Sequence, residues 1–387
     1  MERIIRSSER RKKQNLLRTL HPASKRIKEN IYFRDKACID LSSNDYLGLS
    51  AHPALKDTFI KAAKNSGISS SASRLLSGDS EMFHILEAKV ASFKKTDASL
   101  IFNTGYQANI GIISALFGKK DAVFSDKLNH SSIIDGILLS RAKMFRFRHN
   151  DTSHLEYLLQ NERHKYEDAL IITESVFSMD GDLSPLDELA ILKDKYGCKF
   201  MVDEAHATGI FGESGAGLSE NLTLRNKIDI IMGTFSKALG SFGAYVACSS
   251  CIKKHLINAS RGFIYSTALP LPVIAANIAS LGLIKKEPFR RKSLLENSAC
   301  FRDRLKGLGL DIRGCSQIIP MVIGDSEKTV LISEKLQEKG YWALPIRPPT
   351  VPRGEARIRF SLNYYHKKDM LEKLVDEISD ILHKNKV

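Results

Sequence analysis

Short apolar runs alternate with helical stripes of hydrophobic side chains between about residues 80 and 250. The apolar runs predict strands over residues 99–102, 122–124, 144–147, 169–173, 199–203, 228–232 and 244–247. The stripes predict helices over residues 82–93, 106–116, 131–140 and 186–192. Continuous apolar strands separated by amphipathic helices are typical of a mostly parallel sheet that helices cover on both faces. We therefore predict an α/β fold.

The pattern changes after about residue 285, where helical stripes flank an alternating strand over residues 356–360 (Ala-Arg-Ile-Arg-Phe). This part predicts a smaller α+β domain. We accordingly expect three regions: a basic helix with a short strand segment over residues 1–47, a large α/β domain over residues 48–285, and a small C-terminal domain over residues 286–387.

The composition of the 387 residues, with 43% hydrophobic and 26% charged side chains, is ordinary for a soluble globular protein and excludes a disordered or fibrous chain. The charge is uneven. Ten Lys and Arg residues but only two acids lie within residues 1–28, so this stretch carries +8 of the formal net charge of +14. A basic stretch indicates an anionic partner, such as nucleic acid, anionic lipid or a phosphate-bearing substrate, although a plain solvated helix fits equally well.

The six cysteines predict reduced thiols rather than a metal site, because Cys248-Ser-Ser-Cys251 has no second pair to complete a zinc centre. The longest apolar stretch, residues 269–284, contains two prolines and is shorter than a membrane span. The start of the chain carries charges from Glu2 onward and has no apolar core of signal-peptide length, which does not fit a secretory leader. We expect a cytoplasmic protein without a metal ion and without membrane insertion.

Polar clusters follow several predicted strands, over residues 103–106, 126–130, 174–182, 203–206 and 234–237. Ligands of open α/β sheets bind at the carboxyl ends of the strands, so these clusters predict one site. Residues 203–206 (Asp-Glu-Ala-His) would also suit a helicase-type ATPase. Such an enzyme needs GxxxxGK[ST] for its phosphates, and the sole Gly-Lys pair, Gly118-Lys119, is followed by lysine. We therefore expect no nucleic-acid partner.

Lys237 lies among hydroxyl-bearing and small residues directly after a predicted strand, which suits a lysine that forms a Schiff base. Asp203 ends another strand about thirty residues upstream. Pyridoxal phosphate needs both groups, because a carboxylate against its ring nitrogen keeps the ring protonated and able to accept electrons. The pair predicts a pyridoxal-phosphate enzyme.

The sequence resembles the pyridoxal-phosphate-dependent α-oxoamine synthases over nearly its whole length. This resemblance implies an aspartate-aminotransferase-like (fold type I) architecture. The residues that carry the resemblance are 43–49, 73–75, 105–109, 129–132, 177–182, 203–209, 234–237 and 265–267. Residues 346–352 (Ile-Arg-Pro-Pro-Thr-Val-Pro) resemble the biotin-biosynthesis branch of this family. Residues 69–72 depart from it, since relatives usually carry glycines there, and this predicts a stiffer loop.

The resemblance implies the catalytic roles. Lys237 would bind the cofactor and then act as general base at the α-carbon, while Asp203 would pair with the ring nitrogen. His206 would hydrogen-bond the ring hydroxyl oxygen, and His130 would stack on the ring face next to the substrate.

The resemblance also implies the binding residues. The cofactor phosphate would be held by Gly105, Tyr106, Thr234 and Ser236, with Ser178 at the ring and Thr267 reaching the phosphate of the neighbouring subunit in a homodimer. The amino-acid carboxylate would be held by Arg359 with Asn44, and the acyl donor by Arg18, Arg347 and Thr350.

The implied reaction joins L-alanine to a pimeloyl thioester and releases 8-amino-7-oxononanoate, CO2 and the free thiol carrier. The sequence leaves open whether pimeloyl-CoA or a pimeloyl-acyl carrier protein is the donor. The alternative is a sister activity of the same family, such as the condensation of glycine with acetyl-CoA or of serine with a long acyl donor.

Overall fold

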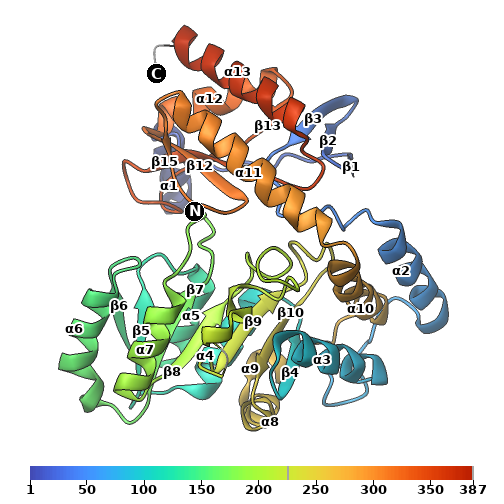
Figure 1. Ribbon diagram of the computed structural model, residues 1–387, viewed down its shortest axis with the longest axis vertical. Coiled ribbons are helices and arrows are strands. Elements are labelled where there is room, and N and C mark those ends of the chain that lie inside the picture. The colour runs from blue at the N-terminus through green and yellow to red at the C-terminus, as the bar shows by residue number, and fades with distance from the viewer. Residues whose placement is uncertain (225, 386–387) are drawn as a thin grey trace. The chain divides into compact units, whose positions relative to one another are not determined.

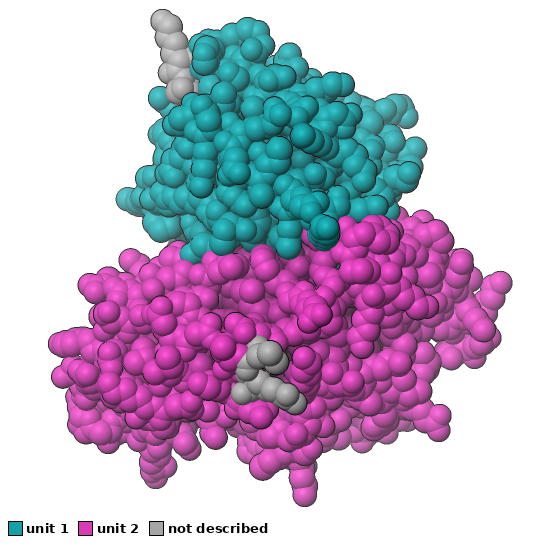
Figure 2. Space-filling model, viewed as in Figure 1, with its two compact units in different colours: residues 1–48, 178–182, 292–387 teal, residues 49–177, 183–291 magenta. Residues whose placement is uncertain are grey.

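The computed structural model describes residues 1–224 and 226–385 and divides the chain into two compact units (Figure 2). The larger unit comprises residues 49–177 and 183–291. The smaller unit comprises residues 1–48, 178–182 and 292–387, so it combines three separate segments of the chain. Within the described ranges, no helix has both the length and the apolar character that a bilayer span requires.

A seven-stranded sheet forms the centre of the larger unit, in the order β4-β10-β9-β8-β7-β5-β6 (Figure 1). Its strands are β4 (Ala98–Phe102), β5 (Ala122–Asp126), β6 (Lys143–Phe147), β7 (Ala169–Glu174), β8 (Lys199–Asp203), β9 (Ile230–Thr234) and β10 (Ala244–Cys248). β10 runs antiparallel to both of its neighbours, whereas β9, β8, β7, β5 and β6 are parallel. The mostly parallel sheet that the sequence predicts is confirmed.

Both faces of this sheet are buried, which explains why its strands are apolar throughout. Along β7, Leu170 and Ile172 belong to one hydrophobic cluster, and Ala169 and Ile171 belong to the other. The first cluster includes residues of α4 (Gly105–Leu116), α5 (Ser131–Ser140), α8 (Ser250–Ala259) and α9 (Arg261–Ile264). The second includes residues of α6 (Thr152–Glu162) and α7 (Leu186–Tyr196). Alternating side chains therefore pack against helices on opposite faces of the sheet.

The remaining helices of the larger unit are α2 (Pro53–Ser66), α3 (Glu81–Lys94) and α10 (Leu271–Lys286), and α10 packs against the other two. Three short 3₁₀ turns, Arg163–Lys165, Leu218–Glu220 and Leu222–Leu224, lie in its connections. The turn at Leu218–Glu220 contacts the segment that follows β8, because Ser219 hydrogen-bonds the Glu204 carboxylate.

Two four-stranded sheets and four helices build the smaller unit, although α11 begins three residues before it. One sheet has the order β11-β12-β15-β14, with β11 (Asp311–Ile312), β12 (Ile318–Gly324), β14 (Pro345–Ile346) and β15 (Ala356–Ser361). The other has the order β1-β2-β3-β13, with β1 (Lys25–Ile27), β2 (Asn30–Phe33), β3 (Lys36–Asp40) and β13 (Tyr341–Trp342). The helices are α1 (Glu2–Lys13), α11 (Phe289–Gly307), α12 (Ser326–Glu338) and α13 (Lys368–Asn385).

Candidate active site

The predicted polar residues of the larger unit lie where parallel strands end. Asp203 is the last residue of β8, Thr234 is the last residue of β9, and His130 follows β5. Asn109 hydrogen-bonds both Asp203 and Ser132, which lies two residues after His130, and the Lys237 charge acts on the His130 imidazole. The structure thus brings together the residues that the sequence places at different strand ends, as expected for an α/β sheet.

The Asp203 carboxylate is buried and held from two sides. Asn109 of α4 donates its side-chain amide to Oδ2 at 2.9 Å, and the Ala205 backbone N–H donates to Oδ1, also at 2.9 Å. Asn109 also donates to the Ser132 hydroxyl at 2.9 Å. Sequence reasoning gave Asn109 no role, although a buried amide within an apolar helix, one turn after Gly105, is an informative signal. The fixed carboxylate is suited to pair with a protonated ring nitrogen.

Lys237 and His206 form the centre of the site. The Lys237 Nζ lies 2.7 Å from the His206 Nε2, and the lysine is only half-buried whereas the histidine is buried. Lys237 is therefore a reachable amine with a hydrogen-bonding neighbour. A nucleophile or base needs this combination of access and orientation.

His130 is the N-cap residue of α5, and its Nδ1 lies 2.8 Å from the Ser132 hydroxyl. Burial lowers the pKa of His130, with the positive charge of Lys237 acting in the same direction and the Asp203 carboxylate opposing both. The Tyr106 ring meets His130 edge-on, with ring centroids 6.4 Å apart. A neutral imidazole held in this way is suited to stack on a flat ring.

The N-terminus of α4 has the features of an anion-binding site. Thr104 caps this helix by accepting a hydrogen bond from the Gln107 N–H at 3.1 Å. Gly105 and Tyr106 follow at the first two helical positions, where backbone N–H groups have no partner within the helix. A Cβ added at Gly105 would meet no atom closer than 3.8 Å. These features fit a phosphate group.

The hydroxyls expected to reach the same phosphate are already engaged with each other. Thr234 donates to the Gly243 carbonyl oxygen at 2.8 Å, and its oxygen lies 2.5 Å from the hydroxyl of Ser236. Ser236 is exposed and is the more accessible of the two. Either hydroxyl would have to rotate to donate to an anion.

In the smaller unit, β15 carries two arginines, Arg357 and Arg359, between which the alternating strand pattern alone cannot choose. Arg357 binds the carboxylates of Asp180 at 2.6 Å and Glu355 at 3.0 Å. The partners of Arg359 in the described part of the chain are neutral: the Ser178 carbonyl oxygen at 2.6 Å, the Asn44 side-chain oxygen at 3.3 Å and the Tyr46 hydroxyl at 3.4 Å. Arg359 is thus the arginine that can still receive a carboxylate.

The three predicted acyl-donor residues also come together in the smaller unit. Arg18 donates to the Thr350 hydroxyl at 2.6 Å, and Arg347 donates to the backbone oxygens of Asn15 and Leu17. All three line a cavity of about 510 Å³. Burial lowers the pKa of Arg347, and the nearby Arg18 charge adds to this effect. Two adjacent guanidinium groups favour an anionic ligand.

Thr267 is exposed and pairs with Ser73 in an isolated β-bridge. The loop before Ser73 is fixed to the same region, because Ser70 donates to the Leu269 carbonyl oxygen at 2.6 Å. Ser71 has φ of +53°, a conformation that glycine adopts more readily than serine. The serine-rich loop thus retains a backbone shape for which the usual glycines are better suited.

Comparisons with known proteins agree on one family. The model of the family "aminotransferase class I and II" matches residues 36–378. The 8-amino-7-oxononanoate synthase of Geobacter sulfurreducens is 45% identical, over 96% of this chain and 95% of the relative, and that of Geobacter metallireducens is 48% identical over 88% of each. Among solved structures, the serine palmitoyltransferase of Sphingomonas wittichii has a TM-score of 0.92 at 28% identity, covering 99% of this chain and 97% of that one. The 8-amino-7-oxononanoate synthase of Francisella tularensis has a TM-score of 0.78 at 29% identity, covering 90% and 99%.

Proposed function

Because this chain belongs to the aminotransferase class I and II family and, within it, to the 8-amino-7-oxononanoate synthases, we propose that it joins L-alanine to a pimeloyl thioester with pyridoxal phosphate as cofactor. The products are 8-amino-7-oxononanoate, CO2 and the free thiol carrier, in biotin biosynthesis. The observation that carries the proposal is the cluster of Lys237, His206 and Asp203 beside the helix N-terminus at Gly105.

Pyridoxal phosphate supplies an electron sink for the bonds broken and formed at the amino-acid α-carbon. Asp203 keeps a proton on the ring nitrogen, His206 hydrogen-bonds the ring hydroxyl oxygen, and His130 stacks on the ring. Lys237 holds the cofactor and moves the α-proton. The phosphate and ring edge are bound by Gly105, Tyr106, Thr234, Ser236 and Ser178.

Arg359 binds the alanine carboxylate with two parallel hydrogen bonds, assisted by Asn44, and so fixes which bond of the α-carbon stands across the ring. This proposal is supported by the neutral partners of Arg359 described above. Arg18, Arg347 and Thr350 bind the acyl donor, whose carrier is either coenzyme A or an acyl carrier protein.

We also propose that the enzyme is a cytoplasmic homodimer in which Thr267 contacts the cofactor phosphate of the neighbouring subunit. The exposure of the Thr267 side chain within a single chain is consistent with this role. Sedimentation equilibrium of the purified protein should give twice the chain mass of 43.3 kDa.

The sister activities remain the alternative, since serine palmitoyltransferases share the fold at 28% identity. Several 8-amino-7-oxononanoate synthases are considerably more similar in sequence, at 43–48% identity, although that of Francisella tularensis is 29% identical. We therefore favour alanine as substrate. The test is to supply alanine, glycine or serine with pimeloyl, acetyl or long-chain thioesters and to identify the product by mass spectrometry. Alanine with the pimeloyl thioester should give the highest kcat/KM, and a preference for another pair would reject the proposal.

Lys237→Ala provides the matched inactive control. We expect its turnover to fall by at least about 100-fold, because a positioned proton-transfer group contributes ~10²–10⁴ in rate. Its circular dichroism should be unchanged. Lys254→Ala, which removes an exposed lysine of α8, should retain full activity.

A further inference from the structure

A buried ion pair joins helix α3 to Glu204, which lies between Asp203 and His206 in the chain. The Nζ of Lys94, the last residue of α3, is 2.5 Å from the Glu204 carboxylate, and both side chains are fully buried. Lys94 also donates to the Thr208 hydroxyl at 3.0 Å and to the Ala216 carbonyl oxygen. All three N–H groups of this ammonium are therefore satisfied by oxygen atoms around the 204–208 segment.

Glu204 is held equally firmly. Ser219 donates to its carboxylate through both the backbone N–H and the hydroxyl, each at 2.8 Å. A Cβ added at Gly217 would come within 2.2 Å of a carboxylate oxygen, so the backbone of Gly217 packs closely against the Glu204 side chain. Burial disfavours the charge of Lys94, but the Glu204 carboxylate and the Tyr245 hydroxyl together outweigh this effect and raise the pKa of Lys94. The charged form of Lys94 is therefore favoured.

Backbone hydrogen bonds of Glu204 extend this restraint to Asp203 and His206, the two neighbouring residues proposed to bind the cofactor. The Glu204 N–H donates to the Met232 carbonyl oxygen at 2.8 Å, and its own carbonyl oxygen accepts from Ala207 and Thr208. The side chain of Glu204 thus fixes a tight turn whose two flanks carry Asp203 and His206. A change in the position of Glu204 would therefore move Asp203, His206 or both.

Buried ion pairs contribute little to stability, because desolvation offsets most of their attraction. We propose that Lys94 is a positioning residue which, through Glu204, sets the orientation of Asp203 and His206 toward pyridoxal phosphate. The inference rests on the proposed function, since it assumes that these two residues bind this cofactor. It assigns a role to a lysine outside the cluster of strand-end residues.

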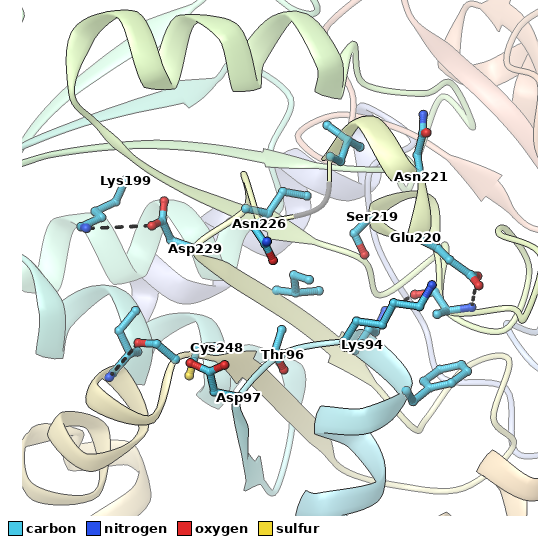
Figure 3. A pocket seen from close by; sticks show the side chains of 18 of the residues that line it. Lys94, Thr96, Asp97, Lys199, Ser219, Glu220, Asn221, Asn226, Asp229 and Cys248 are labelled. Atoms are coloured by element: carbon cyan, nitrogen blue, oxygen red, sulfur yellow. Dashed lines mark hydrogen bonds and ion pairs between the residues drawn. The ribbon is translucent and has the colours of Figure 1, made fainter.

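Figure 3 shows Lys94 and Glu220 among the residues that line a cavity of about 530 Å³ in the larger unit. The cavity lining carries no excess of either charge: Lys95 and Lys199 are balanced by Asp97 and Asp229. Lys199 and Asp229 are themselves 3.9 Å apart, as the dashed line in Figure 3 marks. The Lys94 side chain is fully buried and its ammonium binds Glu204, Thr208 and Ala216, so its contacts are with the protein rather than with a ligand in this cavity.

The test measures cofactor binding rather than turnover. Cofactor-free protein is titrated with pyridoxal phosphate, and binding is followed by visible absorbance. The loaded protein is then titrated with pH, and the pH at which the absorbance of the bound cofactor has changed by half is recorded as the pH midpoint. For Lys94→Met we expect affinity to fall about 10- to 100-fold, the size of effect that small misplacements of catalytic groups produce. The pH midpoint should also shift, because Asp203 and His206 determine where protons reside on the bound cofactor.

Two controls separate positioning from plain stability. Leu159→Ala removes packing from the hydrophobic cluster around α6 and should lower the melting temperature without changing the midpoint. Lys94→Met combined with Glu204→Gln leaves no uncompensated charge, so it should regain stability and yet retain weak binding. If Lys94→Met alone does not fold, this double variant carries the same test.

Wild-type affinity and an unshifted midpoint in the variant that folds would overturn the inference. Binding that simply follows the melting temperature across all variants, Leu159→Ala included, would overturn it as well. Failure of the proposed function would look different, because the wild-type protein itself would then not bind pyridoxal phosphate.

Discussion

At the scale of single residues, Arg357 and Arg359 show what an alternating strand pattern conceals. Alternation places both on one face of β15, and the polar positions of such a pattern are normally exposed. Here all six residues of β15 are buried. Arg357 is neutralised by two carboxylates, whereas Arg359 binds neutral groups. The two identical side chains therefore have different partners, and only Arg359 can receive a further carboxylate.

Replacing each arginine by lysine should reveal this difference. Arg359→Lys keeps the charge but loses the planar fork, so we expect the KM for alanine to rise about tenfold or more with little change in melting temperature. Arg357→Lys should instead lower the free energy of unfolding by about 1–3 kcal/mol, because buried acceptors lose their partners, and leave the KM largely unchanged. Steady-state kinetics and urea unfolding of both variants provide the measurement. Exchange of the two phenotypes would assign the carboxylate to Arg357.

His366 gives the smaller unit a pH dependence. Burial lowers the pKa of His366 to about 3, and its Nδ1 accepts a hydrogen bond from the Asn363 N–H at 3.1 Å. The unfolded chain has the ordinary histidine pKa near 6.5. Between these values the unfolded state binds one proton more than the folded state, so stability falls as the pH drops below about 6.5 and is complete above it.

His366→Asn retains an acceptor for the Asn363 N–H but does not titrate. From pH 7 to pH 5, the unfolding free energy of the wild-type protein should therefore decrease by about 2 kcal/mol more than that of the variant. Urea unfolding at the two pH values, followed by far-UV circular dichroism, measures the difference. Parallel pH profiles would show that His366 is protonated in the folded protein.

The sequence predicted the strand-end residues of the site but not their support. Asp203 and Lys237 could be found because both follow apolar strands and carry the chemistry that the cofactor needs. Asn109 and Lys94 could not be found in this way. Their partners lie 94 and 110 positions away along the chain, at Asp203 and Glu204, and only the packing of α4 and α3 against the sheet brings them together.

At the scale of elements, the apolar runs predicted all seven strands of the large sheet, with ends that differ from the structure by no more than two residues. The expected strand over residues 228–232 is β9, which instead begins at Ile230 and continues to Thr234. Its end is set by pairing with β10, in which Ala244 lies opposite Thr234. The direction of β10 was not predictable either, because a strand buried on both faces has the same apolar pattern whether it runs parallel or antiparallel.

Helix α4 should depend on its cap for both stability and cofactor binding. Thr104→Ala removes the acceptor for the Gln107 N–H and should cost about 1 kcal/mol of unfolding free energy. It should also weaken pyridoxal phosphate binding several-fold, because the frayed first turn holds the anion-binding amides less firmly. Ser249→Ala, which removes the corresponding cap of α8, should have a similar effect on stability and none on cofactor affinity. Equal effects on affinity would show that α4 does not bind the phosphate.

At the scale of the whole molecule, the smaller unit is assembled from segments that no local pattern connects. Residues 178–182 belong to it because Asp180 pairs with Arg357 and the Ser178 carbonyl oxygen accepts from Arg359. Gly181 is required there, since with φ of +66° a Cβ would come within 2.1 Å of the Ile318 carbonyl oxygen. Contacts of this kind are determined by tertiary packing, and they cannot be predicted from the hydrophobic pattern of the sequence.

The basic N-terminal stretch belongs to this same unit. Helix α1 has no buried residue, and its last turn carries Arg10, Arg11, Lys12 and Lys13. Lys12 lines the same cavity as Arg18 and Thr350, the residues proposed to bind the acyl donor. A positive surface beside an acyl-donor site should attract an anionic carrier over a distance that salt screens.

The extent of this surface distinguishes the two carriers. Coenzyme A needs a few contacts close to the cavity, whereas an acidic carrier protein would cover a wide area that includes α1. Reversing Arg10 and Arg11 to glutamate should therefore raise the KM for a carrier-protein-bound donor several-fold and flatten its salt dependence, while the KM for pimeloyl-CoA stays constant. The matched control reverses Lys61 and Lys64, two exposed lysines of α2 in the larger unit, and should affect neither donor. If the KM values for both donors are insensitive to the reversal at α1 and to ionic strength, this helix is a solvated surface, and the acyl donor is recognised at the cavity alone.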